Sequence, residues 1–461
     1  MNFKIFIGIS LIISMCAISG NAANKRPPYQ YPAEPEVLQK LKDWQDLKFG
    51  LFMHWGSYSQ WGVVESWNLC PEDQPWIKRH ADKSYFEYVK EYENLITTFN
   101  PVKFNPDKWA KAAKEAGMRY VVFTTKHHDG FNMFDTKQSD YKITGSTCPF
   151  RTNPRANVAK EIFNAFRKEN MLAGAYFSIT DWHNDDFWWK YFPPFGRNIN
   201  YSPEKYPEKW TRLNEFIYKQ LEELVSDYGK IDLMWFDLIG VSKEKKVDWP
   251  RFAGMMREKQ PGVILVARGS GDKYENYRTP EQEVPEEPLD YPWETCMTMG
   301  DQWSFKPGDK YKSAHRIVQL LAKIVSRGGN FLLNIGPGPD GDFDPVAYER
   351  LAEIGAWMKI NSEAIYGTKP VKPYQQDKIV FTKKADYVYA IYLPDEKETT
   401  LPAKIAITAI QPQEGSQLYL LGCEKPLEWE KADKGISINV PVNLQDKPPC
   451  QQAWVFKLKV P

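Results

Sequence analysis

Residues 211–237, TRLNEFIYKQLEELVSDYGKIDLMWFD, combine an amphipathic helical pattern with a short apolar run that ends in an acid. In the first part, apolar side chains recur at helical spacing and so share one helix face: Leu213, Phe216, Ile217, Leu221 and Leu224. Ile231–Phe236 then has the pattern of a buried strand, and Asp237 follows it directly. The stretch predicts a helix–strand unit with a carboxylate at the carboxyl end of the strand.

Helical patterns and short apolar runs alternate in this way through most of the chain. Further strands are expected at Phe49–His54, Tyr120–Thr125, Ala173–Ile179, Val263–Ala267 and Asn330–Ile335. Such alternation predicts a parallel sheet, and its length favours a closed (β/α)8-like barrel over an open sheet. We expect this barrel over residues 24–368. Active sites of such barrels lie at the carboxyl ends of the strands.

The pattern changes near residue 369. Short alternating runs follow, separated by turn residues, as in an antiparallel β-sandwich: 379–382, 387–393, 404–407, 417–421, 436–440 and 453–458. We therefore expect a second, C-terminal β-sandwich domain over residues 369–461.

The N-terminus has the pattern of an export signal. One lysine precedes an apolar run, Ile5–Ile18, and small residues follow it, which predicts a signal peptide over residues 1–23 and a periplasmic or extracellular location. The run is shorter than the roughly 20 residues that span a bilayer, so we do not expect an integral membrane protein. Lipid attachment at Cys16 is a less favoured alternative, because the bulky Met15 precedes it.

The composition restricts the class of ligand. Of 461 residues, 60 are Lys or Arg and 59 are Asp or Glu, so the formal net charge is +1. This balance argues against a nucleic-acid partner, which would require a basic excess. Aromatic residues make up 15% of the chain, and they suit either a large core or flat platforms for a ligand such as a sugar.

Polar residues follow several of the expected strands. His54 ends the first strand, and Glu65 and Trp67 lie in the loop after it. His127 and His128 end the next strand, while Trp235 and Asp237 end a third and Arg268 follows a fourth. Since the strand ends meet at one edge of a barrel, this set predicts a functional site there.

Two kinds of chemistry fit this set. A metal centre is disfavoured because the chain has no His-x-His pair, and the adjacent His127 and His128 would point to opposite faces of a strand. The other is glycoside hydrolysis, which needs two carboxylates and hydrogen-bonding groups for a polyol. Asp237 is the first carboxylate, and the second comes from the acidic segment after Arg268: Glu281, Glu283, Glu286, Glu287 and Glu294.

At this point the sequence resembles a known family. The segments FGLFMHWG at 49–56, KHHDGF at 126–131, Trp-x-Asp at 235–237 and GGNFLLNIGP at 328–337 are similar to the α-L-fucosidases of glycoside hydrolase family 29. The resemblance covers residues 47–366 and the pattern of the C-terminal β-domain.

The resemblance implies an exo-acting, retaining enzyme that releases terminal fucose without a cofactor or metal. It implies that Asp237 is the nucleophile and that Arg268 belongs to the site. It assigns contacts with sugar hydroxyls to His54, Glu65, Trp67, His127 and His128. Trp235 would pack beside the nucleophile, and Phe305 would line the pocket for the sugar's methyl group.

For the acid/base the resemblance offers two positions. Glu281, in Tyr277-Arg278-Thr279-Pro280-Glu281, matches the loop that supplies this residue in several members. Glu294, in Trp293-Glu294-Thr295-Cys296, is the runner-up. We therefore predict Glu281 as the acid/base.

Alternatives from other classes stay open at this point. One is a retaining glycosidase that acts on another sugar, such as a galactoside. Another is a sugar-binding relative without catalytic activity. The expected partners are fucosylated oligosaccharides or glycoconjugates, while the sequence leaves the fucosyl linkage and the oligomeric state open.

Overall fold

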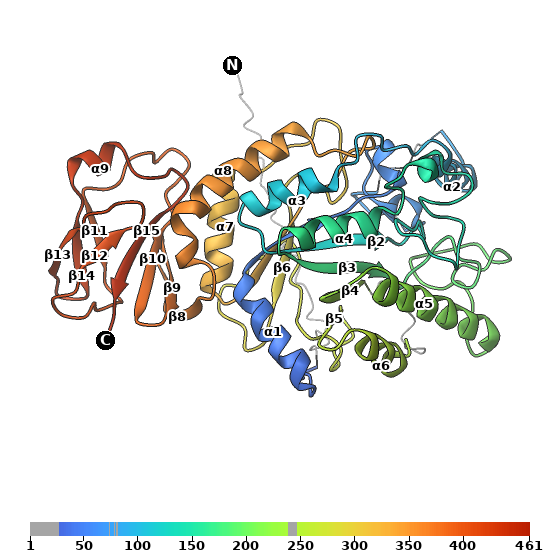
Figure 1. Cartoon of the computed structure of the whole chain (residues 1–461), viewed down its shortest axis with the longest axis horizontal. Coiled ribbons are helices and arrows are strands. Elements are labelled where there is room, and N and C mark those ends of the chain that lie inside the picture. The colour runs from blue at the N-terminus through green and yellow to red at the C-terminus, as the bar shows by residue number, and fades with distance from the viewer. Residues whose placement is uncertain (1–26, 73, 78, 80–81, 238–246) are drawn as a thin grey trace, which may run out of the picture.

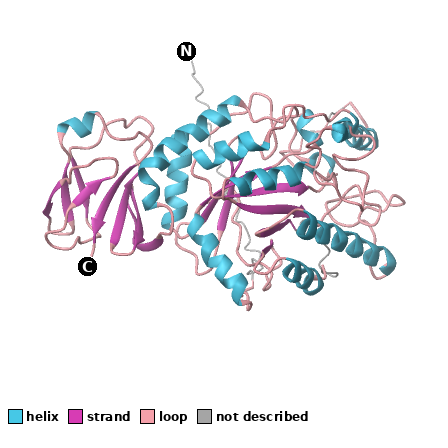
Figure 2. Cartoon of the chain, viewed as in Figure 1, coloured by secondary structure: helices cyan, strands magenta, loops and turns pink. Residues whose placement is uncertain are grey.

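The chain folds into a barrel followed by two antiparallel sheets (Figures 1 and 2). The structure is a computed structural model, and it describes residues 27–461 except 73, 78, 80–81 and 238–246. The expected signal peptide, residues 1–23, and Cys16 lie outside the described residues. Within the described residues, no helix combines the length and the apolar character that a membrane span requires.

A seven-stranded parallel sheet forms the barrel wall, in the order β5-β4-β3-β2-β1-β7-β6. The strands are short and almost wholly buried, as expected where helices cover a parallel sheet: β1 Phe49–Met53, β2 Tyr120–Lys126, β3 Leu172–Ser178, β4 Leu233–Asp237, β5 Ile264–Ala267, β6 Glu294–Thr298 and β7 Asn330–Asn334. This arrangement confirms the predicted (β/α)8-like fold class. β6 was not among the strands expected from the sequence.

The gap between β5 and β6 is bridged by an irregular segment, residues 274–282. On one side, the Asn276 N–H donates to the Leu265 carbonyl at 2.9 Å. On the other side, the Cys296 N–H donates to the Pro280 carbonyl at 3.2 Å, and Glu281 forms a parallel bridge with Cys296. An irregular connection therefore stands where a regular eighth strand would be.

Amphipathic helices pack around the sheet: α1 Pro35–Leu47, α2 Tyr85–Asn94, α3 Pro106–Glu115, α4 Val158–Lys168, α5 Pro207–Asp227, α6 Trp249–Lys259, α7 Ala314–Ser326 and α8 Pro345–Asn361. In α5 the predicted apolar stripe is buried at Leu213, Ile217, Leu221 and Leu224. Several helices begin at a side-chain cap; the Ser313 hydroxyl, for example, accepts from the Arg316 N–H at the start of α7.

The C-terminal part contains a five-stranded sheet, β12-β15-β10-β9-β8, and a three-stranded sheet, β11-β14-β13. Their bounds are β8 Lys369–Gln376, β9 Ile379–Lys384, β10 Tyr387–Tyr392, β11 Lys404–Ile407, β12 Leu418–Leu420, β13 Glu428–Lys431, β14 Ile436–Asn439 and β15 Trp454–Lys459; the short helix α9, Val442–Asp446, precedes β15. β8 and β13 were not expected, because β8 contains two prolines and β13 alternates around charged residues. Both are edge strands, where such residues are tolerated.

The five-stranded sheet packs on both faces. Phe381, Ala390 and Phe456 face a core shared with the three-stranded sheet. Their neighbours Val380 and Ile391 belong to the core cluster of the barrel. Helices α7 and α8 lie between the barrel strands and this sheet (Figure 1), so the apolar cores of barrel and C-terminal sheets are in direct contact.

Candidate active site

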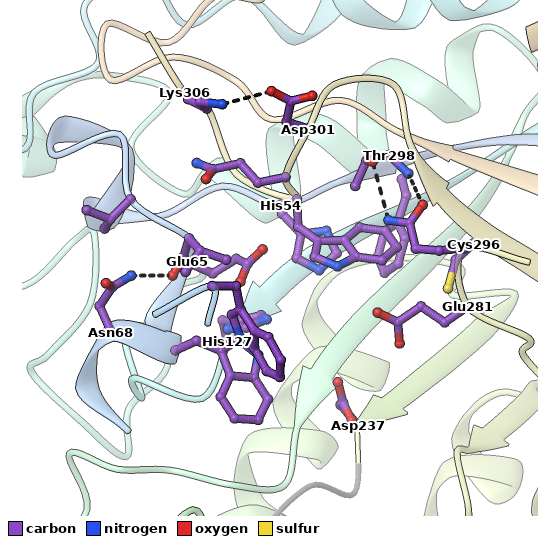
Figure 3. A pocket seen from close by; sticks show the side chains of 18 of the residues that line it. His54, Glu65, Asn68, His127, Asp237, Glu281, Cys296, Thr298, Asp301 and Lys306 are labelled. Atoms are coloured by element: carbon purple, nitrogen blue, oxygen red, sulfur yellow. Dashed lines mark hydrogen bonds and ion pairs between the residues drawn. The ribbon is translucent and has the colours of Figure 1, made fainter. Parts of the chain in front are cut away.

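A cavity of about 820 Å³ opens at the carboxyl ends of the barrel strands (Figure 3). Its floor consists of buried residues: Phe52, His54, Glu65, Asn68, His127, Tyr176, Trp235, Asp237, Cys296 and Thr298. Its mouth consists of half-buried or exposed ones: Gly62, Val63, Val64, Trp67, Pro75, Trp76, Arg268, Glu281, Gln282, Asp301, Gln302, Trp303 and Lys306. A pocket of this volume encloses a small organic ligand.

Asp237 is the last residue of β4, and its carboxylate is surrounded by polar groups. The Tyr176 hydroxyl donates to Asp237 Oδ2 at 3.2 Å. His128 Nε2 and Arg268 Nη1 each lie 3.8 Å from the same oxygen. The Tyr176 hydroxyl and the Arg268 guanidinium therefore hold the carboxylate in a largely buried position, as a nucleophile requires.

Glu281 belongs to the segment that bridges β5 and β6. Its carboxylate pairs with Arg268 Nη2, so one guanidinium contacts both Glu281 and Asp237. The Glu281 side chain is 39% exposed, against 9% for Asp237. Figure 3 shows both carboxylates on one side of the cavity, with Glu65 and His127 across from them. The site thus pairs a buried carboxylate with a more accessible one.

The three histidines are held by neutral hydrogen bonds. His54 Nδ1 lies 2.7 Å from the Asn334 side-chain oxygen, and His127 Nδ1 lies 2.5 Å from the Ser66 hydroxyl. Burial lowers the pKa of His54 to about 3 and that of His127 well below its usual value. Both rings are uncharged near neutral pH.

His128 presents a nitrogen lone pair toward Asp237. Its Nδ1 lies 2.6 Å from the Ser178 hydroxyl, which donates to the Thr180 carbonyl at 2.7 Å. Because the hydroxyl proton is used there, Nδ1 carries the hydrogen and Nε2 is an acceptor. Burial lowers the pKa of His128 to about 4, although Asp237 opposes the shift.

The sequence-based argument about His127 and His128 was wrong in its geometry. β2 ends at Lys126, so the two residues lie past the strand and do not alternate across it. Their ring centroids are 4.2 Å apart. Within the described ranges, no group of three or more His, Cys, Asp or Glu residues is arranged to hold a metal ion.

Glu65 is a wholly buried acid whose side chain lines the cavity. Burial raises its pKa to about 8, and the charges of Glu281 and Asp237 act in the same direction. Near neutral pH it is a carboxylic acid that offers one donor and one acceptor to the cavity.

Comparison with known proteins identifies the family. A family model described as "Alpha-L-fucosidase" matches residues 16–363, and one described as "Alpha-L-fucosidase C-terminal domain" matches residues 372–459. The chain belongs to the α-L-fucosidase family.

Individual relatives agree with this assignment. An α-L-fucosidase of Branchiostoma floridae is 29% identical over 98% of this chain and 99% of its own length. Tissue α-L-fucosidase of Homo sapiens is 28% identical over 97% of this chain and 96% of its own length. Among solved structures, α-L-fucosidase isoenzyme 1 from Paenibacillus thiaminolyticus has a TM-score of 0.75 at 28% identity, covering 92% of this chain and 100% of that chain. This fucosidase family consists of glycoside hydrolases, and the predicted enzyme class is confirmed.

Glu294, the runner-up acid/base of this fucosidase, does not line the cavity. It is the first residue of β6, wholly buried, and its carboxyl accepts hydrogen bonds from Tyr120 at 2.5 Å and Tyr277 at 3.1 Å. Burial raises its pKa to about 8. Of the two candidates, only Glu281 opens onto the cavity that Asp237 lines.

The fucosidase cavity brings together most of the predicted sugar-binding residues: His54, Glu65, Trp67, His127, Trp235 and Arg268. His128 contacts Asp237 without lining the cavity. Phe305 does not line it either; its ring lies beside Gly338, and Trp303, two residues earlier, lines the cavity instead.

The sequence did not predict three further residues at or beside the cavity: Tyr176, Trp303 and Asn334. Tyr176 lies within the apolar run of β3, where it resembles a core residue. Its strand position gives the only signal, because Tyr176 and Ser178 are two residues apart and therefore share a face. Asn334 is the last residue of β7, just as His54 directly follows β1. Its position at a strand end could therefore have identified it from the sequence.

Proposed function

We propose that Asp237 and Glu281 carry out the retaining hydrolysis of terminal α-L-fucosides on fucosylated glycans. Asp237 attacks the anomeric carbon while Glu281 gives its proton to the departing glycosidic oxygen. A fucosyl ester on Asp237 results. Glu281, now a carboxylate, takes a proton from water, which attacks the same carbon and releases fucose with net retention.

The contact of Arg268 with both carboxylates is the observation that carries this proposal. Retaining enzymes need their two carboxyl groups about 5–5.5 Å apart, and one guanidinium that contacts both keeps them close. To act as an acid, Glu281 must turn from Arg268 toward the glycosidic oxygen, and its exposed position at the mouth gives it room to do so. A similar solved structure from Bacteroides thetaiotaomicron, 25% identical with a TM-score of 0.72, is of a covalent intermediate trapped with 2-fluoro-fucosyl fluoride.

The remaining floor residues would bind the sugar. The neutral rings of His54 and His127 and the acid form of Glu65 offer donors and acceptors to hydroxyl groups. Trp67 and Trp235 supply apolar surface, as a 6-deoxy sugar requires. We assign the wall near the methyl group to the 303–305 segment, which contains both Trp303 and Phe305.

Azide separates the two carboxylate roles. Asp237→Ala and Glu281→Ala should each lower kcat by about 10³-fold or more. With sodium azide, Asp237→Ala should give the inverted β-fucosyl azide, because azide enters the space of the nucleophile. Glu281→Ala should give the retained α-fucosyl azide, because azide replaces water in the second step. Product configuration is read by NMR.

The opposite pairing of product configuration with variant would contradict the assignment. Glu294→Gln is the matched control: it should show no azide rescue, because Glu294 does not open onto the cavity. An α-fucosyl azide from a Glu294 variant would make Glu294 the acid/base instead.

We also infer that the protein is exported, supported by the signal pattern of residues 1–23. We place the domain boundary at residues 368–369. The start of the edge strand β8 at Lys369 supports this division.

A further inference from the structure

The cavity is larger than a single deoxy sugar requires, and its two zones differ in exposure. Asp237 and His54 in the floor are 6% and 5% exposed, while Trp76 at the mouth is 49% exposed. Glu281 stands between these zones. Because an acid/base contacts the glycosidic oxygen, the group to which fucose is attached lies on the mouth side of Glu281.

One side of the mouth is aromatic and held in place. Trp76 is among the few exposed large apolar side chains of the described residues, and it lines the cavity. Its ring packs edge-on against Trp67 at 6.4 Å. Arg197 lies 4.8 Å from the Trp67 ring and pairs with Glu72 at 2.6 Å. The loop that carries Trp76 is thereby tied to the segment around Arg197.

The mouth also contains a polar group of residues, Asp301, Gln302 and Lys306, and its charges are paired. Lys306 pairs with Asp301 at 2.8 Å. The Gln302 amide nitrogen faces three protein oxygens at 3.3 Å, which leaves its Oε1 as an acceptor with no partner in the described part of the chain. These groups suit hydroxyl groups better than a sulfate or carboxylate.

From these contacts we propose that the mouth is a binding site for a neutral saccharide that carries the fucose. The apolar face of its first sugar stacks on Trp76, and a hydroxyl group donates to Gln302 Oε1. An aromatic ring beside hydrogen-bonding groups at the mouth of a cavity is typical of a site that fixes the orientation of a ligand. This proposal rests on the proposed function and extends it from the fucosyl unit to the aglycone.

Two substrates distinguish binding in the mouth from binding in the floor. α-L-Fucosyl fluoride has a single-atom aglycone and reports on the floor alone. A neutral trisaccharide with fucose on a lactose core occupies floor and mouth together. For Trp76→Ala we expect kcat/KM on the trisaccharide to fall about tenfold, the effect of truncating a well-placed contact aromatic, with fucosyl fluoride unchanged. Trp76→Phe should recover most of the loss.

Phe86→Ala is the matched control, because Phe86 is 67% exposed and does not line the cavity. This variant should hydrolyse both substrates with the kcat/KM of the wild type. Equal rates of wild type and Trp76→Ala on the trisaccharide would overturn the proposal, as would equal losses on both substrates. A preference for a sulfated trisaccharide over the neutral one would overturn its neutral character. Failure of the wild type to hydrolyse fucosyl fluoride would instead contradict the proposed function.

Discussion

Burial has the same effect on the histidines and on Glu65: it removes charge. It lowers the pKa of His54 and His128 to about 3 and 4 and raises the pKa of Glu65 to about 8. Near neutral pH these groups bind as neutral donors and acceptors, while Arg268 makes ionic contacts with Asp237 and Glu281. This arrangement suits a neutral sugar.

Glu65 should therefore produce an alkaline limb in the activity profile. As pH rises through about 8, Glu65 ionises, loses its donor hydrogen and adds negative charge beside Asp237 and Glu281. We expect kcat/KM on fucosyl fluoride, whose leaving group needs no proton from Glu281, to fall with an apparent pKa near 8. Glu65→Gln should lack this limb. The same limb in wild type and variant would show that another group titrates.

The individual site residues that the sequence predicted are polar residues at the ends of apolar runs. His54, His127 and Asp237 interrupt hydrophobic patterns and were identified for that reason. Tyr176 was not identified, because its aromatic ring continues such a pattern in the sequence, although its hydroxyl donates to Asp237 in the structure. Phe305 does not line the cavity, whereas Trp303 does. The sequence of an irregular loop does not determine which of its aromatic rings faces a cavity.

Among the elements, the segment 274–282 decides how the barrel closes and where Glu281 lies. Sequence could not predict its conformation, because it has neither strand alternation nor helical periodicity and contains Pro280. The sequence did not predict β6 for a related reason. Its polar residues Glu294, Thr295 and Thr298 lack the apolar character of a buried strand, but they are buried and hydrogen-bonded inside the protein. Side-chain partners far apart in sequence stabilise both elements.

Glu294 on β6 should affect stability in a pH-dependent way. Its pKa of about 8 in the folded protein lies above the ordinary glutamate value of 4.5, so its contribution to stability is most favourable below pH 4.5 and is lost as pH rises toward 8. Relative to Glu294→Gln, the wild type should lose about 1.4 kcal/mol per pH unit in this interval. Urea unfolding of both proteins at pH 5 and pH 7.5 measures the change, and a pH-independent difference would contradict it.

For the whole molecule, the alternation of strand and helix patterns was enough to predict the order of barrel and sandwich. Only the regular helices and strands could be predicted from such patterns. The contact between the two cores could not be predicted from the sequence. The residues that make it, such as Val380 and Ile391, alternate with others that face the three-stranded sheet.

The shared core predicts that the barrel depends on the C-terminal sheets. A chain ending at residue 368 would uncover the sides of α7 and α8 and would remove the Ala453 carbonyl that accepts from the Trp357 indole at 2.9 Å. We expect this truncated protein to aggregate in size-exclusion chromatography and to lack activity, although it retains every cavity residue. A monodisperse, active fragment would mean that the barrel is stable alone.

A substrate analogue that forms a long-lived ester would label the nucleophile of the covalent step. The protein is incubated with 2-deoxy-2-fluoro-fucosyl fluoride, digested and mapped by mass spectrometry. We expect one fluorofucosyl group per chain, attached to Asp237, and no labelling of Asp237→Ala under the same conditions. A label on any other residue, or turnover of fucosides by Asp237→Ala at the wild-type rate, would contradict it.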